Sequence, residues 1–431
     1  MLFAKTLRLH PPTSSHKHYT NKCSILTNFC IKNFMYSFDV NPQKEAYIPD
    51  YNHYHNLTAI TSNIADIVAK NPSFMRIDWS YKSKENRPQI LLHITNFTGS
   101  VSHSSQTVQT AIPKIRVLLS YGEHAREFIP IESLFYLLQN LTSGLGAPHD
   151  SPEEIFTRTI LSKFNLYIIV MANPDGRKIV EKTKNYCWRG TSSGVDLNRN
   201  FDWEFGNAGS SDNPKDEEYR GKHVFSEIES KVYTELTGQQ SFDAFISFHS
   251  GIRQIYLPYA DTKSKSTVRE PPHLKIMTTL AEHLSVATKH RYSYGKAYDL
   301  GFYTADGTIF DYIAGKKQVP ISMAIELWGK PNHKGLSCFD QFNPKSRHLK
   351  VKCTLFLIHS IFNTLSLHAC LSSITTQEFI TLTDSMVRYL SYYLLIAAVV
   401  SSPDVSVCGM EIGASYQPRG FPPRTPVSSH C

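Results

Sequence analysis

The sequence predicts an α/β fold of three layers, in which a central mixed, twisted β-sheet is flanked by helices. Short apolar runs that end at glycine, proline, histidine or charged residues alternate with stretches in which apolar residues recur every three or four positions. The first pattern is typical of buried strands, and the second of helices that bury one face. Strands and helices that alternate in this way build layered α/β folds, so we expect functional groups where strands end.

Five runs are predicted as strands and four stretches as helices. The predicted strands cover residues 90–94, 115–120, 165–171, 242–248 and 321–327. One helix is predicted from a shared apolar face made by Leu57, Ile60, Ile64, Ile67 and Val68. The other helices are predicted at 131–141, at a capping-box start in which Glu229 follows Ser226 by three residues, and through Leu274, Met277, Ala281 and Leu284.

The length of 431 residues and the hydrophobic content of 41% suffice for one large core. We expect a single domain, of a size typical of an enzyme, over residues 46–364. An atypical N-terminal segment, 1–45, lacks a sustained period and is expected to be poorly ordered, and the appendage 365–431 ends in a Pro- and Ser-rich stretch. The apolar run 389–400 is too short for a comfortable bilayer crossing, so we expect a short helix there and no stable membrane span.

The charge pattern argues against a nucleic-acid partner. The net charge of +8 comes from 45 basic and 37 acidic residues scattered along the chain, with no long Lys/Arg block of the kind that follows phosphates. We therefore expect no nucleic-acid binding. We separately expect the protein to be a monomer.

Cysteine usage and glycosylation signals bear on localisation. The chain has eight cysteines and no CxxC pair, which argues against a thiolate zinc site or a redox motif; a disulfide between Cys187 and Cys338 is one possibility. Sequons at Asn56, Asn96 and Asn140 are compatible with the secretory pathway or an extracellular location. The first forty residues nevertheless form a poor signal peptide, since Lys32 and polar residues interrupt their apolar stretch.

Three residues form a candidate metal site. In "IRVLLSYGEHAREF", a predicted strand leads into His124 and Glu127, and in "FDAFISFHS" another ends at His249. A catalytic zinc ion takes three such nitrogen and oxygen ligands and leaves one position for water. The alternatives are a surface ion pair for the first two residues and a hydrogen-bonded core residue for His249.

A series of separated motifs runs through the chain in the order "GEHARE", "NPDG", "YCWRG", "GVDLNRNF", "YRG" with "FSEIE", "SFHSG" and "AIELWG". Together these motifs resemble the zinc carboxypeptidases of the M14 type, over roughly residues 47–362. The resemblance implies a zinc carboxypeptidase-like α/β/α fold. It also implies one zinc ion, held by His124, Glu127 and His249.

The resemblance further implies a role for each matched residue. Asn198 and Arg199 match the pair that binds the C-terminal carboxylate of a substrate, for which a planar guanidinium is suited. Arg189 matches the arginine that holds the developing oxyanion. Arg126 matches a residue that contacts substrate, although a salt bridge to a neighbour such as Glu123 is the alternative.

Two further matches concern proton transfer and the mobile loop. Glu326, in "ISMAIELWG", matches the general base and acid, which takes a proton from the zinc-bound water and passes it to the leaving amine. Tyr303 matches the tyrosine that covers the substrate carboxylate, chosen over Tyr312 because it lies eight residues before Asp311.

The resemblance also bears on selectivity, and the sequence departs from it in two places. Phe310 stands where relatives selective for basic C-terminal residues carry an aspartate, which argues for neutral or apolar C-terminal residues; Asp299 and Asp306 could still offer a negative wall. Gly251 replaces a tyrosine of the digestive relatives, which puts an outer subsite in doubt. Fewer than fifty residues precede the predicted domain, so activation by removal of a propeptide is not expected.

The leading hypothesis is a metallocarboxypeptidase, an exopeptidase that acts on the C-termini of peptides or proteins. One alternative is a zinc amidohydrolase or deacylase of the aspartoacylase type, which shares HxxE and a later histidine. The other is a catalytically inactive peptide-binding protein on the same scaffold. Such proteins commonly lose the base or a ligand, and all four of those residues are present here.

Overall fold

The computed structural model describes residues 49, 51–97, 113–301, 303–329, 337–345, 361, 362 and 365. These residues belong to one compact unit, Glu45–Cys431. The predicted N-terminal segment and the apolar run 389–400 lie outside the described residues. Within the described part of the chain, no helix is long and apolar enough to cross a membrane.

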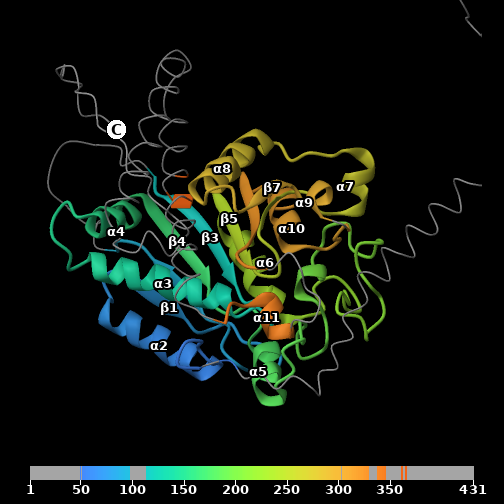
Figure 1. Cartoon of the computed structure of the whole chain (residues 1–431), viewed down its shortest axis with the longest axis horizontal. Helices are drawn as coiled ribbons and strands as arrows, with labels where there is room; N and C mark the ends of the chain where they lie inside the picture. The colour runs from blue at the N-terminus through green and yellow to red at the C-terminus, as the bar shows by residue number, and fades with distance from the viewer. Residues whose placement is uncertain are drawn as a thin grey trace, which may run out of the picture. The chain divides into compact units, whose positions relative to one another are not determined.

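The centre of the fold is an eight-stranded mixed sheet with the order β1-β2-β4-β3-β5-β8-β6-β7 (Figure 1). The strands are β1 (Met75–Asp78), β2 (Leu91–Ile94), β3 (Ile115–Tyr121), β4 (Phe164–Ile169), β5 (Ala244–His249), β6 (Gln254–Leu257), β7 (Ser293–Lys296) and β8 (Ile321–Glu326). Strands β4, β3, β5 and β8 run parallel, whereas β1, β2 and β6 introduce antiparallel pairs. The predicted mixed sheet and all five predicted strands are confirmed.

Side chains alternate between the two faces of this sheet. In β3, Val117 and Leu119 belong to one buried cluster and Leu118 to a second. In β5, Ile246 joins the first cluster and Phe245 the second. Because successive side chains of a strand point to opposite faces, each cluster marks one face of the sheet.

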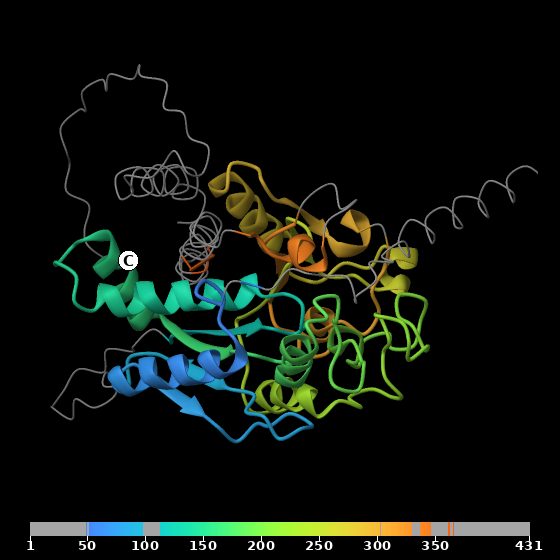
Figure 2. The same cartoon turned by 60° about the horizontal axis from the view of Figure 1, so that its bottom comes forward.

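Helices cover both faces. The first cluster contains side chains of α2 (Leu57–Lys70), α3 (Ile129–Gly144), α4 (Pro152–Lys163) and α8 (Leu274–Ala287), and the second those of α6 (Lys231–Gln239) and α10 (Ile309–Gly315). The remaining helices are α5 (Pro174–Thr183), α7 (Thr262–Thr267), α9 (Ala297–Leu300), α11 (Cys338–Phe342) and the 3₁₀ turns η2 (Leu197–Arg199) and η3 (Ile228–Ser230). The three-layer α/β/α prediction is thus confirmed. The segment between α5 and α6, drawn in green, folds largely without regular elements (Figure 2).

The predicted capping box at Ser226 is wrong. The turn η3 is preceded by Glu227, and no side chain caps it. Ser226 Oγ instead accepts a hydrogen bond from Asn200 Nδ2, and Glu229 Oε1 accepts one from Lys84 N. Tertiary partners therefore take both side chains that the local pattern would have used.

The carboxyl ends of three parallel strands bring the predicted site together. Strand β3 ends three residues before His124, and His249 at the end of β5 pairs in register with Glu326 at the end of β8. A disulfide joins Cys187, in the segment after α5, to Cys338 at the start of α11, as considered from the sequence. The bridge lies beside the site and links two cysteines that are 151 residues apart in the sequence.

We expect the disulfide to contribute substantially to stability. Replacing both cysteines by serine should lower the free energy of unfolding by about 2–5 kcal/mol, because the bridge restricts the unfolded chain. Denaturant titration with and without a reductant measures this. The reductant should destabilise the wild type and leave the double variant unchanged; equal sensitivity of both proteins would contradict the prediction.

Candidate metal centre

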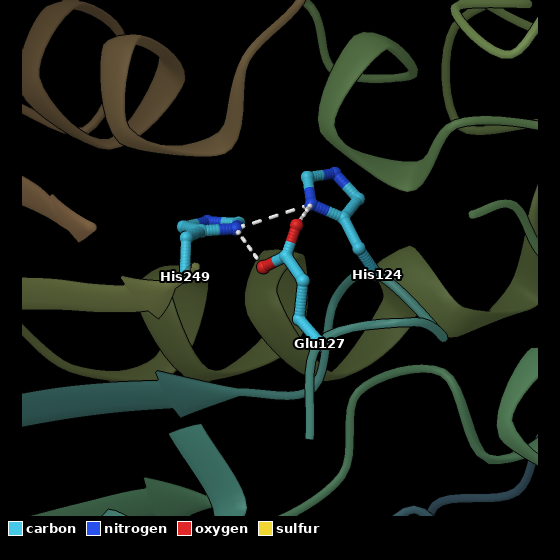
Figure 3. Close-up of side chains that lie close together, drawn as sticks. All are labelled: His124, Glu127 and His249. Carbon is cyan, nitrogen blue, oxygen red and sulfur yellow. Dashed lines mark hydrogen bonds and ion pairs between the residues drawn. The ribbon is translucent and has the colours of Figure 1, made fainter. Parts of the chain in front are cut away.

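The side chains of His124, Glu127 and His249 point toward one another at the end of the sheet (Figure 3). Glu127 Oε1 lies 2.8 Å from His124 Nδ1, and Glu127 Oε2 lies 3.2 Å from His249 Nδ1. The two Nδ1 atoms are 3.2 Å apart, and all three side chains are buried. One ligand atom from each residue lies within 4.8 Å of the others, so this set can hold a single metal ion.

The turn between β3 and α3 depends on Gly122. Its φ of +71° lies in the left-handed region, and a Cβ there would stand 2.6 Å from Met171 Sδ. Glycine is therefore needed to turn the chain out of the strand. Further along, Ala125 N donates to Arg189 O and Glu127 N donates to His124 O, which fixes the residues that carry the first two candidate ligands.

Each histidine is held from behind by a carboxylate. His124 Nε2 lies 3.1 Å from Asp196 Oδ1, and His249 Nε2 lies 3.0 Å from Glu123 Oε2 and 2.7 Å from Ser247 Oγ. These contacts turn both Nδ1 atoms toward Glu127. Metal-binding histidines in proteins have this arrangement, since the outer carboxylate fixes the ring and its tautomer.

The charge balance and donor set fit a cation. Glu123, Glu127 and Asp196 place three buried carboxylates around the two imidazoles, and the nearest balancing cation is Arg189. Burial raises the pKa of Glu127, but His124 and His249 together outweigh this effect and the pKa is lowered, so this candidate ligand is ionised. Two imidazole nitrogens and a carboxylate are ligands that a catalytic zinc ion takes.

Among the described residues, Arg126 and Glu123 do not form the salt bridge that the sequence offered as an alternative. Glu123 contacts His249 and also accepts hydrogen bonds from Ser120 and Ser247 Oγ. Arg126 instead pairs with Glu217, with Nη1 2.6 Å from Oε2. The outer roles of Glu123 and Asp196 were missed from the sequence, although both lie inside quoted motifs.

Glu326 lies beside the candidate ligands with a free carboxylate oxygen. Its Oε2 is buried and has no hydrogen-bond partner among the described residues. Burial and the neighbouring Glu127 raise its pKa to about 7. A carboxylate with such a pKa can both take and release a proton near neutral pH.

Three predicted arginines surround the centre. Arg189 Nε donates to Asp196 Oδ2 at 2.8 Å, and its Nη1 lies 3.9 Å from Glu127 Oε1. Arg199 is buried, with Nη1 3.7 Å from Asp196 Oδ2. Arg126 Nη1 donates to Cys187 O and to Glu217 Oε2.

The remaining predicted residues lie in α10, in the segment before it, or in contact with its first residue. Asn198 Oδ1 accepts a hydrogen bond from Ile309 N, which ties the predicted carboxylate-binding pair to the start of this helix. Tyr303 is 45% exposed. Burial and Glu218 raise the pKa of its phenol, whereas Arg199 and Arg189 act in the opposite direction. Phe310 is buried in the second cluster, and Ser322 Oγ donates to its carbonyl.

Gly251 has a structural explanation. A Cβ at this position would lie 3.2 Å from the ring of Phe342, the last residue of α11. The ring of Phe342 in turn lies 4.1 Å below the guanidinium carbon of Arg126. Phe342 therefore limits the space in which a larger side chain at residue 251 would stand.

Comparisons with known proteins agree with this geometry. The family model described as zinc carboxypeptidase matches residues 60–354. Zinc carboxypeptidase A 1 of Anopheles gambiae is 28% identical over 293 residues, which cover 64% of this chain and 60% of that protein. Carboxypeptidase A1 of Rattus norvegicus is 29% identical over 277 residues, or 61% and 60% of the two chains. The chain thus spans about 60% of the length of these relatives.

Solved structures support the fold. Bovine thrombin-activatable fibrinolysis inhibitor, in complex with tick carboxypeptidase inhibitor, superposes with a TM-score of 0.60 at 23% identity, covering 74% of this chain and 98% of that one. Carboxypeptidase A from Helicoverpa armigera gives a TM-score of 0.60 at 18% identity, covering 81% of each chain. With a family model that matches more than half of its residues and a fold of this type, the chain belongs to the zinc carboxypeptidase family.

Proposed function

We propose that this protein is a zinc-dependent metallocarboxypeptidase that hydrolyses the C-terminal peptide bond of peptides or proteins. The observation that carries the proposal is the grouping, at one sheet end, of a buried three-ligand set, a carboxylate with a free oxygen, and arginines. Metal, proton acceptor and anion-binding groups are the parts that such a hydrolysis needs.

The proposed division of labour begins with the metal and the base. A zinc ion held by His124, Glu127 and His249 would lower the pKa of its water to about 7 and polarise the scissile carbonyl. Glu326 accepts the proton at Oε2 and later delivers it to the leaving amine. The raised pKa of about 7 supports this double role, because either protonation state is accessible near neutral pH.

The arginines are proposed to recognise negative charge at two points. Arg189, steadied by Asp196, stabilises the oxyanion that develops on the scissile carbonyl. Arg199 and Asn198 bind the terminal carboxylate, and the Tyr303 phenol closes over it. Arg126 contacts the substrate further from the cleaved bond.

We further propose a secretory or extracellular location. The disulfide between Cys187 and Cys338 supports it, because structural disulfides persist in oxidising compartments. No contact among the described residues specifically favours the deacylase or inactive-binder alternative.

Replacing Glu326 by glutamine should lower kcat by about 10²–10⁴-fold, because the amide cannot accept the proton. Bound zinc, measured by atomic absorption, should stay near one ion per chain. Glu282→Gln, on the exposed side of α8, is the matched control and should leave both values unchanged. Full activity of the Glu326 variant would exclude this residue as the base.

Removal of the metal should abolish turnover. Dialysis against a chelator removes the ion that polarises the carbonyl, and added zinc should restore the rate. Release of the last residue from a peptide is measured before and after. A chelated protein that holds no zinc and keeps its rate would rule out metal-dependent hydrolysis.

Peptides that end in Phe or Leu should be cleaved with higher kcat/KM than peptides that end in Lys or Glu. The reason is that apolar Phe310 stands where an acidic residue would select a basic side chain. A panel that differs only in the last residue tests this. Preference for Lys would show that another acidic group sets the pocket.

A further inference from the structure

Arg199, which is proposed to bind the substrate carboxylate, already forms an ion pair with a carboxylate of the protein itself. Arg199 Nη2 donates to Glu218 Oε1 at 3.3 Å. Its Nε donates to Gly209 O and its Nη1 to Asn198 O, so each guanidinium nitrogen has a partner. Substrate would therefore meet a guanidinium whose charge is partly neutralised.

The segment that carries Glu218 is anchored to the site. Ser211 N donates to Glu218 O and Arg220 N donates to Ser211 O, so the segment pairs with itself. The next residue is fixed as well, because Asp196 N donates to Tyr219 O at 2.8 Å. The backbone next to Glu218 is thus tied to Asp196, the residue that contacts His124 and Arg189.

Adjacent Glu217 makes a similar contact with the second substrate arginine. Glu217 pairs with Arg126, and Glu218 with Arg199, so two successive carboxylates face two arginines. The environments of the two ion pairs differ. The side chain of Glu218 is 25% exposed, against 48% for that of Glu217. Burial raises the pKa of Glu218 despite the neighbouring arginines, so this contact carries a desolvation cost.

We propose that Glu218 is a specificity-determining residue, which competes with the C-terminal carboxylate of the substrate for Arg199. The proposal rests on the proposed function of the site. Because the backbone of Glu218 is fixed while its side chain reaches solvent, the carboxylate can turn away without unfolding the segment. The substrate carboxylate then has to displace one charge-assisted hydrogen bond before it forms its own.

This competition acts on binding and not on the chemical step. Glu218 opposes the substrate carboxylate equally in the ground state and in the transition state, so it raises KM and leaves kcat unchanged. It also narrows the difference in affinity between a peptide with a free C-terminal carboxylate and the same peptide as an amide.

The test is Glu218→Gln, which keeps a hydrogen-bond acceptor for Arg199 and removes the charge. KM for a peptide with a free carboxylate should fall roughly tenfold with kcat within about twofold, the change expected when a competing charged hydrogen bond is replaced by a weaker neutral one. Asp212→Asn is the matched control: it removes the same charge from the same segment, at a side chain that is 87% exposed. Its KM should match that of the wild type.

Binding is measured separately from turnover. In a Glu326→Gln background, calorimetry should show tighter binding of the free acid after Glu218→Gln and unchanged binding of the C-terminal amide. Equal binding of the free acid with and without the Glu218 change, or no binding to either protein, overturns the proposal. Weaker binding also overturns it, because Glu218 would then position Arg199. Absence of turnover by the wild type counts against the proposed function alone, since the calorimetric comparison still decides the role of Glu218.

Discussion

The site depends on the contacts made by one buried carboxylate, that of Asp196. It lies 3.1 Å from His124 Nε2, 2.8 Å from Arg189 Nε and 3.7 Å from Arg199 Nη1. A buried charge is costly unless it is paired, and these partners offset the cost, so its pKa is well below the usual value although burial raises it. One side chain therefore contacts a candidate metal ligand, the proposed oxyanion arginine and the proposed carboxylate arginine, and fixes their relative positions.

The sequence predicted those strands whose residues show a clear pattern without reference to their neighbours in the fold. The buried runs of β3, β5 and β8 are long and apolar, so their pattern identifies them. Strands β1, β6 and β7 were not predicted from the sequence. Each has only four residues, with polar and partly exposed positions, so pairing with neighbouring strands stabilises them more than their own composition does. The predicted domain limits stay predictions.

The candidate site divides in the same way. His124 and Glu127 lie three residues apart, and the motif order pointed to His249, so the sequence alone was enough to propose the candidate ligand set that the structure groups together. Their outer partners were not, because the contacts of Glu123 and Asp196 depend on where the chain returns after long separations. Glu123 is three residues from Arg126, yet its side chain turns to His249 across the sheet end, 126 residues later in sequence. The pairing of Glu218 with Arg199 likewise exists only in the folded segment.

Helix α11 and the residue that follows it also shape the site, at the position of Gly251. Asn343, just after α11, accepts hydrogen bonds from Phe128 N and Ile129 N and donates to Arg126 O. It thereby caps the start of α3, whose own N-terminal residue gives no side-chain cap. The disulfide at Cys338 holds the other end of α11. Phe342 lies between these two anchors, against Arg126, so this edge of the candidate site is occupied by α11 and not by a side chain at residue 251, two positions after His249.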